Sequence, residues 1–456
     1  MRFREEKDSM GTVRVPEDAY YGAQTQRAAD NFPISGLRLP PALNRALARI
    51  KKCAARVNAD LGLLEKKTSD AIVRAAGEAL EGKFDDQFIV DVFQTGSGTS
   101  ANMNMNEVLA SRANEILTGK KGGKSPVHPN DHVNKCQSSN DVIPSAIHIA
   151  ALTLIHGRLI PSLEKLRKSL SAKSREFADV KKIGRTHLQD AVPITLGQEF
   201  SGHARQIELG AERARDLDRR LGELALGGTA VGNGLNAHPD FASQTIALIC
   251  RETGLPLREA KNHFAAQAAQ DAAVEAGGAL KTLALSLMKI TDDIRWMASG
   301  PRCGFGEIHI PSLQPGSSIM PGKINPVIPE SLLQAAAQVI GNDAAIVMGA
   351  RSGHFELNTA LPLIAHNLLQ SISLLSAASG VLAEKCVAGI SADREKCLSG
   401  VEKSLSLSAA LIPLIGYDRA AEIAGKAHRE NKTIRQVALE EDVASRSDLD
   451  RLFGDG

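Results

Sequence analysis

The sequence predicts a mostly α-helical protein built around a bundle of about five long helices. Hydrophobic residues make up 43% of the 456 residues but aromatic residues only 4%, so the core must be built from Ala, Leu, Ile and Val. Proline is absent from several long stretches and is crowded into residues 301–329. Because proline breaks the interior of a helix, the stretches without it permit long helices, and the crowded segment must be a loop.

The long helices are expected in five stretches, which are residues 142–178, 194–238, 257–300, 330–350 and 363–412. Apolar side chains recur there at helical spacing, as in the series Leu280, Leu283, Leu287, Ile290 and Ile294. Helices of this length that are apolar on more than one side need neighbours on several sides. We therefore expect a homo-oligomer, with a monomeric bundle as the alternative.

The two ends of the chain follow different patterns. Residues 12–15 alternate as in a small pair of strands, and helices fit residues 42–59, 68–81 and 103–117, the last of them stopped by Gly119. After about residue 390 the pattern becomes shorter and more charged, as in a small helical cap. Three domains are expected: a mixed, mainly helical domain over residues 1–138, the long-helix bundle over 139–394 and a small helical domain over 395–456.

Charge and cysteine usage narrow the class of protein. The net charge is only +2, which argues against a nucleic-acid partner. The N-terminus lacks an apolar signal segment, and no stretch is expected to reach the roughly 20 apolar residues that span a bilayer. Six cysteines lie far apart without a Cys-x-x-Cys pair, so reduced thiols are favoured over three disulfides. We expect a cytoplasmic protein that binds neither nucleic acid nor membrane.

The most informative segment is Gly316–Pro326, which reads Gly-Ser-Ser-Ile-Met-Pro-Gly-Lys-Ile-Asn-Pro. Its glycines and prolines predict a mobile but shaped loop. The loop offers two hydroxyls, one ammonium group on Lys323 and one amide on Asn325, and a lysine and an asparagine can hold a carboxylate together. A solvated turn with a surface lysine is the alternative.

Two further loops with small hydrogen-bond donors open predicted helices. They are Gly96–Asn102 and Gln137–Asp141. Glycines let backbone N–H groups approach an anion, and a helix N-terminus favours negative charge. The first loop is not a Walker loop, because no Gly-Lys-Ser/Thr follows; plain capping of the helix by Ser100 or Asn102 is the alternative. Without a phosphate motif, these loops indicate a small carboxylate substrate.

Three other motifs carry residues that could take part in chemistry. His187 lies between hydroxyl and amide neighbours just before a long helix, although a lone histidine is usually structural. His128 and His132 are four residues apart, but Pro129 argues against a helix there and nothing completes a zinc set, so no metal site is expected. Residues 228–234 are glycine-rich without a Gly-x-Gly-x-x-Gly pattern, so no nicotinamide or flavin cofactor is expected.

Taken with these motifs, the chain closely resembles the class II fumarate hydratases of the fumarase/aspartase superfamily. The resemblance runs through almost the whole length, from Asp8–Gly11 and Gln24–Arg27 through Asn31–Gly36 to Ile415–Asp418. The signature Gly-Ser-Ser-x-Met-Pro-x-Lys-x-Asn-Pro is highly specific to the superfamily, but several of its lyases share it.

Within the superfamily, aspartate ammonia-lyase is the main alternative. The stretch Asn130–Cys136 looks more like those enzymes, which typically carry glutamine in place of His187 and alanine in place of Gly322. Argininosuccinate and adenylosuccinate lyases share the signature but diverge elsewhere. A non-catalytic oligomer is disfavoured because the candidate residues His187, Ser317, Lys323, Asn325 and Glu330 are all retained.

The resemblance implies a three-domain, mostly helical protomer whose five-helix bundles associate into a homotetramer, with each active site drawing loops from three subunits. It also implies reversible hydration of fumarate to (S)-malate in the tricarboxylic acid cycle, without metal or organic cofactor. By the same resemblance Ser317 is the carbon base, while His187, paired with Glu330, exchanges a proton with the water or hydroxyl. The implied substrate-binding residues are Ser97, Gly98, Thr99, Ser138, Ser139, Asn140, Thr186, Ser318, Lys323, Ile324 and Asn325.

A second anion site is also implied, at His128, Pro129, Asn130 and Asp131. Family members often place a basic residue where this chain has Ser125-Pro126, so the affinity and role of that site are open. At the implied active site, Ser317 can act as a base only if its pKa is lowered, because a free hydroxyl is a very weak acid. We expect Lys323 and neighbouring loop N–H groups to lower the pKa of Ser317 when the loop closes over substrate.

Overall fold

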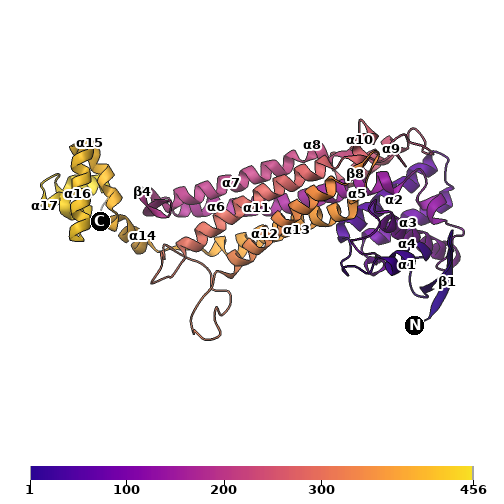
Figure 1. Cartoon of the computed structure of the whole chain (residues 1–456), viewed down its shortest axis with the longest axis horizontal. Coiled ribbons are helices and arrows are strands. Elements are labelled where there is room, and N and C mark those ends of the chain that lie inside the picture. The colour runs from indigo at the N-terminus through magenta and orange to yellow at the C-terminus, as the bar shows by residue number, and fades with distance from the viewer. Residues whose placement is uncertain (1, 454–456) are drawn as a thin grey trace. The chain divides into compact units, whose positions relative to one another are not determined.

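The structure is a computed structural model that describes residues 2–453. It is mostly helical, and its strands form only two-stranded sheets within the described residues, which confirms the predicted fold class (Figure 1). The chain divides into two compact units. The first unit holds the residues up to 161 together with 212–284 and 336–376, and the second holds 162–211, 285–335 and the residues from 377 on. The three-domain division at 138/139 and 394/395 stays a prediction.

The N-terminal part of the first unit is a hairpin followed by helices. Strands β1 (Phe3–Asp8) and β2 (Gly11–Pro16) pair antiparallel, which confirms the strand pair expected around residues 12–15. The three expected helices are present as α2 (Pro41–Asp60), α3 (Lys66–Leu80) and α4 (Thr99–Thr118), preceded by α1 (Ala23–Asn31). Helix α4 ends at Gly119, whose φ of +76° is favourable for glycine.

Each of the five expected stretches contains a long helix, although the helices in 194–238, 257–300 and 363–412 cover only part of the stretch. The long helices are α5 (Ser139–Leu154) continued by a π-turn η3 (Ile155–Leu159) and α6 (Ile160–Glu176), then α7 (Leu196–Asp216), α11 (Asp271–Met297), α12 (Val327–Ala350) and α13 (Leu361–Lys385). Helix α7 ends at Asp216, well before residue 238, and the short elements α8 (Asp218–Leu221) and β5 (Glu223–Leu224) follow it. Beyond them, Gly227, Gly232 and Gly234 adopt positive φ values that no right-handed helix contains. The absence of proline permitted a longer helix but did not require one.

Polar side chains tie the long helices to one another inside each unit. In the first unit Lys281 of α11 pairs with Asp343 of α12 at 2.5 Å, and the amide of Asn342 donates to Ser371 of α13 at 3.1 Å. In the second unit His203 of α7 contacts Asp293 of α11 at 3.0 Å. The cores between these contacts are aliphatic, as the low aromatic content predicts.

Shorter elements complete both units. The first unit also contains η1 (Asp85–Gln87), η2 (Pro129–Val133), α8 (Asp218–Leu221), β5 (Glu223–Leu224), α9 (Phe241–Thr253), β6 (Arg258–Glu259), α10 (His263–Ala268), β8 (Gly353–His354) and β9 (Leu357–Asn358). The second contains β3 (Lys181–Thr186), β4 (Gln189–Thr195), β7 (Ile308–His309), η4 (Val387–Gly389) and β10 (Ser391–Ala392). Its C-terminal elements are α14 (Arg394–Lys403), η5 (Leu405–Leu411), α15 (Ile412–Ile415), α16 (Tyr417–Glu430), α17 (Ile434–Glu440) and α18 (Arg446–Phe453). These C-terminal elements enclose a small apolar core of their own, as expected for a helical cap.

The expectation that no stretch reaches membrane-spanning length was wrong. Ser139–Glu176 and Leu361–Gly389 are long and apolar enough to cross a membrane by length and composition, and the bent pair Arg394–Lys403 and Leu405–Ile415 passes the same test as one span. The most apolar windows of the two long stretches are 67% and 44% buried inside the protein. A bundle helix that packs on several sides needs the same aliphatic composition as a membrane helix, so composition alone does not separate the two.

Gly96 is the glycine whose replacement the fold tolerates least. A Cβ atom there would lie 1.8 Å from the carbonyl oxygen of Thr359, whereas a Cβ at Gly77, inside α3, would meet nothing within 4 Å. We expect Gly96→Ala to lower the free energy of unfolding by about 1–3 kcal/mol through overpacking. Gly77→Ala should raise it by about 0.5–1 kcal/mol, because alanine favours the helix. Thermal denaturation at one protein concentration measures both, and equal stability of the two variants would contradict this account.

Candidate active site

The N-termini of two long helices meet in the first unit. Helix α4 begins at Thr99 and helix α5 begins at Ser139, and the hydroxyls of these two residues lie 2.6 Å apart. The hydroxyl of Ser97 lies 2.7 Å from that of Thr99, so three hydroxyls form a continuous row. A helix N-terminus carries partial positive charge and unpaired N–H groups. Two such ends beside a row of hydroxyls form a place suited to a carboxylate.

Local sequence explains why both helices begin at these positions. Gly98 is the N-cap of α4, and its φ of +73° favours glycine. A Cβ on Gly98 would also lie 2.9 Å from the side chain of Ile143, so backbone conformation and packing both require glycine here. Capping by Ser100 or Asn102, the alternative considered from the sequence, does not occur. Ser138 caps α5 in a capping box, in which Asp141 accepts the Ser138 backbone N–H at 2.9 Å.

The glycine-rich segment at residues 228–234 lies against this cluster. The side-chain amide of Asn140 donates to the carbonyl oxygen of Ala230 at 2.8 Å. Asp141 accepts the backbone N–H groups of Gly227 at 2.9 Å and Thr229 at 3.1 Å. The segment therefore holds the start of α5 in place, a role that the sequence did not suggest.

Two ionisable side chains near the start of α5 are fully buried. Lys51 of α2 and Asp141 both have 0% exposure. Burial lowers the pKa of Lys51 to about 7. The nearby charge of Asp141 has the opposite but smaller effect on this pKa. Burial raises the pKa of Asp141 to about 6, opposed by its three backbone N–H donors and by Lys51. Sequence reasoning named Asp141 only as the last residue of the loop Gln137–Asp141 and missed Lys51, although helical spacing places Lys51 beside the buried Leu47 and Ala55 and thus on the apolar face of α2.

In the second unit, His187 stands at the tip of a strained hairpin. Thr186 and Gln189 form the last residue pair between strands β3 and β4. His187 and Leu188 therefore make a two-residue turn, with φ values of +58° and +59°. Such turns normally carry Asn-Gly, because residues other than glycine adopt positive φ at a cost. Strained backbone of this kind is concentrated at functional sites. The conformation of this exposed turn is therefore a reason to consider His187 functional that does not depend on any motif.

A largely buried ionic cluster anchors strand β3 next to this turn. Arg185 makes two hydrogen bonds to Glu307, at 3.0 and 2.8 Å, and its guanidinium lies over the ring of Phe305. Lys182, which is 1% exposed, donates to Glu199 at 2.6 Å. These contacts fix the strands firmly enough to hold the strained turn at their end.

The loop with Ser317 closes on itself. The N–H of Gly316 donates to the carbonyl oxygen of Lys323 at 2.9 Å, and the side-chain amide of Asn325 donates to the carbonyl oxygen of Gly316 at 2.5 Å. The hydroxyl oxygen of Ser317 accepts the N–H groups of Ile319 and Met320 at 3.2 and 3.0 Å. The side chains of Ser318 and Lys323 are exposed.

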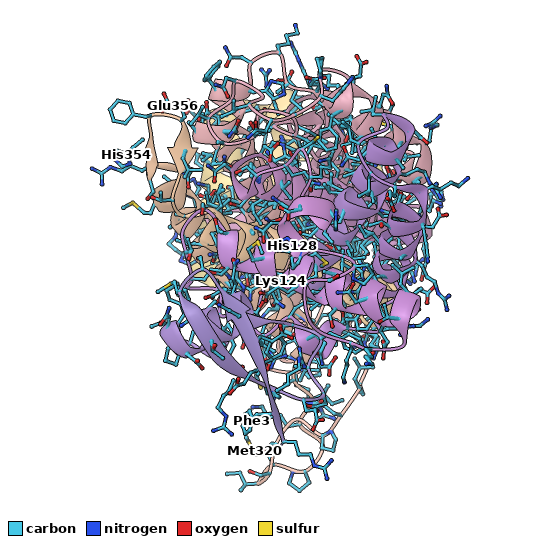
Figure 2. The ribbon with its side chains drawn as sticks, turned by 90° about the vertical axis from the view of Figure 1, so that its right-hand side faces the viewer. Phe3, Lys124, His128, Met320, His354 and Glu356 are labelled. Carbon is cyan, nitrogen blue, oxygen red and sulfur yellow. The ribbon has the colours of Figure 1, made fainter. Side chains whose placement is uncertain are left out.

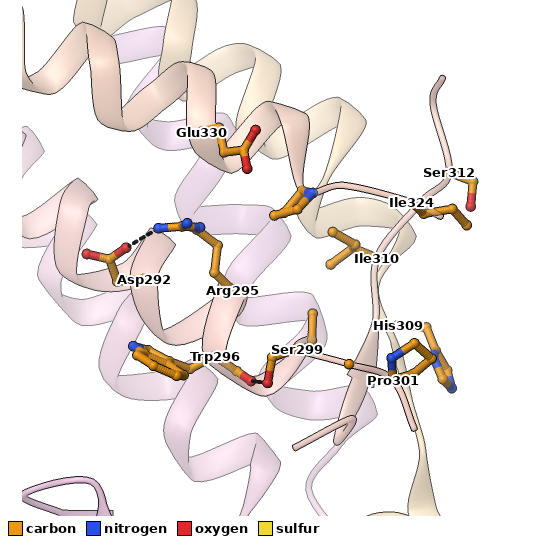
Figure 3. A pocket seen from close by; sticks show the side chains of 13 residues that line it. Asp292, Arg295, Trp296, Ser299, Pro301, His309, Ile310, Ser312, Ile324 and Glu330 are labelled. Carbon is orange, nitrogen blue, oxygen red and sulfur yellow. Dashed lines mark hydrogen bonds and ion pairs between the residues drawn. The ribbon is translucent and has the colours of Figure 1, made fainter. Parts of the chain in front are cut away.

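Glu330 lies in the first turn of α12 and lines a cavity of about 720 Å³ in the second unit (Figure 3). Ile324, at the end of the Ser317 loop, lines the same cavity, as do Arg295 and Trp296 of α11 and His309. Arg295 pairs with Asp292 at 3.0 Å. The cavity thus combines an acid, a base and apolar walls beside one of the predicted catalytic residues.

The structure divides the predicted site residues into two groups. The first unit brings together Ser97, Gly98, Thr99, Ser138, Ser139 and Asn140. The second carries Thr186, His187, Ser317, Ser318, Lys323, Ile324, Asn325 and Glu330. Across residues 2–453, no hydrogen bond or ion pair joins His187 to Glu330 or Ser317 to Lys323 within one protomer.

The predicted second anion site is a short π-helical turn, η2 (Pro129–Val133). The expectation that Pro129 excludes a helix was wrong, because proline occupies its first position, where no N–H is needed. His128 caps the turn, since its Nδ1 accepts the N–H groups of Asn130 and Asp131, both at 3.2 Å. Lys124 is exposed on the same face of the first unit as His128 (Figure 2). Anion binding at this turn stays a prediction.

Comparison with known proteins identifies the family. A family model described as lyase matches residues 11–341, and one described as the fumarase C C-terminus matches residues 407–454. The chain belongs to the class II fumarate hydratase family. It is 56% identical over 438 residues to the class II fumarate hydratase of Nitrosomonas europaea, covering 96% of this chain and 95% of that one.

Two further relatives agree. The class II fumarate hydratase of Mycobacterium tuberculosis is 55% identical over 454 residues, covering 98% of this chain and 94% of that one. Among solved structures, the class II fumarase from Schistosoma mansoni is similar with a TM-score of 0.95 at 40% identity, covering 99% of this chain and 98% of that one. The resemblance found in the sequence is thereby confirmed.

The buried Lys51 predicts a pH dependence of stability. Its pKa of about 7 in the folded protein lies below the ordinary value of 10.5, so the unfolded chain binds more protons between these two values. The free energy of unfolding therefore gains a contribution that rises as pH increases from about 7 to 10. Melting temperatures from pH 7 to 9 should rise more in the wild type than in Lys51→Met. Lys52→Met, in the same helix, serves as the control and should keep the wild-type slope; a Lys51→Met slope equal to both would contradict the prediction.

Proposed function

We propose that the protein catalyses the reversible hydration of fumarate to (S)-malate. The observation that carries this proposal is the meeting of two helix N-termini at Thr99 and Ser139, with the hydroxyl row that they present. One carboxylate of a small dicarboxylate fits that place by charge and by hydrogen bonding. The relatives named as class II fumarate hydratases support fumarate as the substrate.

In the direction from malate, Ser317 removes a proton from the carbon beside one carboxylate. The electron pair moves onto that carboxylate and gives a dianionic intermediate, which needs strong electrostatic stabilisation that Lys323 and Asn325 supply. The bond between the neighbouring carbon and its hydroxyl then breaks as the double bond of fumarate forms. A proton delivered through His187, paired with Glu330, turns the departing hydroxide into water.

Two features of the Ser317 loop support its role as a base. The N–H groups of Ile319 and Met320 donate to the Ser317 oxygen and favour its deprotonated form. The ammonium group of Lys323 lies on the same loop, which can change shape because its closing contacts are few. Closure over substrate would bring Lys323 towards Ser317 and lower the pKa of Ser317 further.

The division of site residues between two units supports a site built from several subunits. We propose a homotetramer in which each site takes the hydroxyl row from one subunit and the His187 and Ser317 segments from others. On this proposal the protein acts in the cytoplasm, in the tricarboxylic acid cycle, and needs no metal or organic cofactor. It is not expected to bind nucleic acid or membrane.

The test is an absorbance measurement at about 240–250 nm, where the double bond of fumarate absorbs. Purified protein receives (S)-malate in one cuvette and L-aspartate in another. A rise with malate alone is expected. A rise with aspartate alone would make the protein an ammonia-lyase, the alternative that the stretch Asn130–Cys136 favours, and no rise with either substrate would refute both activities.

Ser317→Ala should lower kcat for malate dehydration by about 10²-fold or more, because general base catalysis typically contributes 10²–10⁴. The melting temperature should stay near the wild-type value, since the Ser317 side chain lies in an open loop and accepts only local N–H groups. Ile319→Ala, at an exposed neighbour that is not among the predicted site residues, shows how much activity a small change in the same loop removes. Near-normal turnover by Ser317→Ala would refute its role as the base.

A further inference from the structure

The segment Ser138–Asn140 lies between two buried side chains of opposite charge. Lys51 contacts the turn just before the segment, and Asp141 follows it directly in the chain. Within residues 2–453, no hydrogen bond joins either residue to the hydroxyls of Ser97, Thr99 and Ser139. Lys51 nevertheless binds two side chains of the turn that precedes Ser138, and Asp141 binds backbone N–H groups around the start of α5.

On the first side, Lys51 holds the turn at residues 134–137. Its ammonium group donates to the side-chain oxygens of Asn134 and Gln137, both at 2.9 Å. Asn134 Oδ1 accepts two more donors, from Asn102 and Asn106 of α4, both at 3.1 Å. Lys51 thereby connects α2, the start of α4 and the turn that leads into Ser138.

On the other side, Asp141 fixes the start of α5 to the segment at residues 227–230. One carboxylate oxygen accepts the N–H of Ser138, and the other accepts the N–H groups of Gly227 and Thr229. The carbonyl oxygen of Thr229 in turn accepts the side-chain amide of the buried Gln267 at 2.9 Å. This arrangement sets the position of Ala230, to which Asn140 donates.

We propose that Lys51 and Asp141 are positioning residues of the fumarate site, which hold Ser139 and Asn140 in the geometry that binds the substrate carboxylate. The inference rests on the proposed function and adds two residues to it. A buried charge that served only stability would be hard to explain, because a well-packed apolar side chain usually stabilises a core as well or better. A charge gains value where it must hold several polar backbone and side-chain groups in one arrangement.

The experiment compares Lys51→Met and Asp141→Asn with the wild type by steady-state kinetics and by hydrogen–deuterium exchange. In both variants we expect KM for fumarate to rise about tenfold or more while kcat changes less. In Lys51→Met, exchange should accelerate about fivefold in peptides covering residues 134–141. In Asp141→Asn it should accelerate at Gly227 and Thr229, which lose a carboxylate acceptor. Exchange in α16 should remain unchanged in both.

Lys173→Met is the matched control, because Lys173 is also buried and donates to a backbone carbonyl, that of Ile390, in the second unit. It should alter stability without raising KM. If Lys51→Met does not fold, Gln137→Met removes one of the two Lys51 contacts and tests the same link.

The outcomes separate the two proposals. Unchanged KM in a folded Lys51→Met or Gln137→Met variant overturns the positioning role while leaving fumarate hydration intact. A raised KM with unchanged hydrogen–deuterium exchange at residues 134–141 in these variants also overturns the positioning role. A wild-type protein that does not hydrate fumarate refutes the proposed function. In that case exchange at residues 134–141 and at Gly227 and Thr229 still decides whether the two buried charges hold the segment.

Discussion

The hydroxyl contact between Thr99 and Ser139 is the constraint on which the rest of the site depends. The hydroxyls of Thr99 and Ser139 lie 2.6 Å apart. This is possible only if α4 and α5 begin at these two residues, so that the positive ends of both helices meet. Gly98 allows this at α4 because it adopts positive φ and leaves room for Ile143, and the capping box of Ser138 and Asp141 allows it at α5. A carboxylate bound there would offset the repulsion between the two helix ends, so binding and fold share one electrostatic basis.

The proposed binding groups and the proposed reacting groups are held in different ways. Ser139 is buried, and the residues just before it are held by Lys51, through Asn134 and Gln137, and by Asp141, which accepts the N–H of Ser138. His187 and Ser317 instead lie on a turn and a loop with few tertiary contacts, and the strain at His187 is tolerated because Arg185 and Glu307 anchor the strands beneath it. A rigid place for the substrate and movable groups for proton transfer suit a reaction in which a loop closes and then releases product.

Much of the fold could be predicted from the sequence, and the reasons for the exceptions are physical. Proline spacing and helical periodicity located the long helical stretches, but the absence of proline does not show where a helix ends, since α7 stops at Asp216 and α13 at Lys385. Pro129 begins a helical turn rather than preventing one, and aliphatic bundle helices reach membrane-spanning length. The three donor-rich loops were found as motifs, whereas the roles of His187 and Ser317 came only from family resemblance. Lys51 was missed because its partners, Asn134 and Gln137, are more than 80 positions away in the chain.

The most direct test of this account is a crystal structure of the protein with (S)-malate bound. The account predicts one substrate carboxylate within hydrogen-bonding distance of the hydroxyls of Thr99 and Ser139 and the side chain of Asn140, with the Ser317 loop of another subunit closed over it. A malate molecule bound instead only in the cavity lined by Arg295 and Glu330, with the hydroxyl row empty, would contradict it.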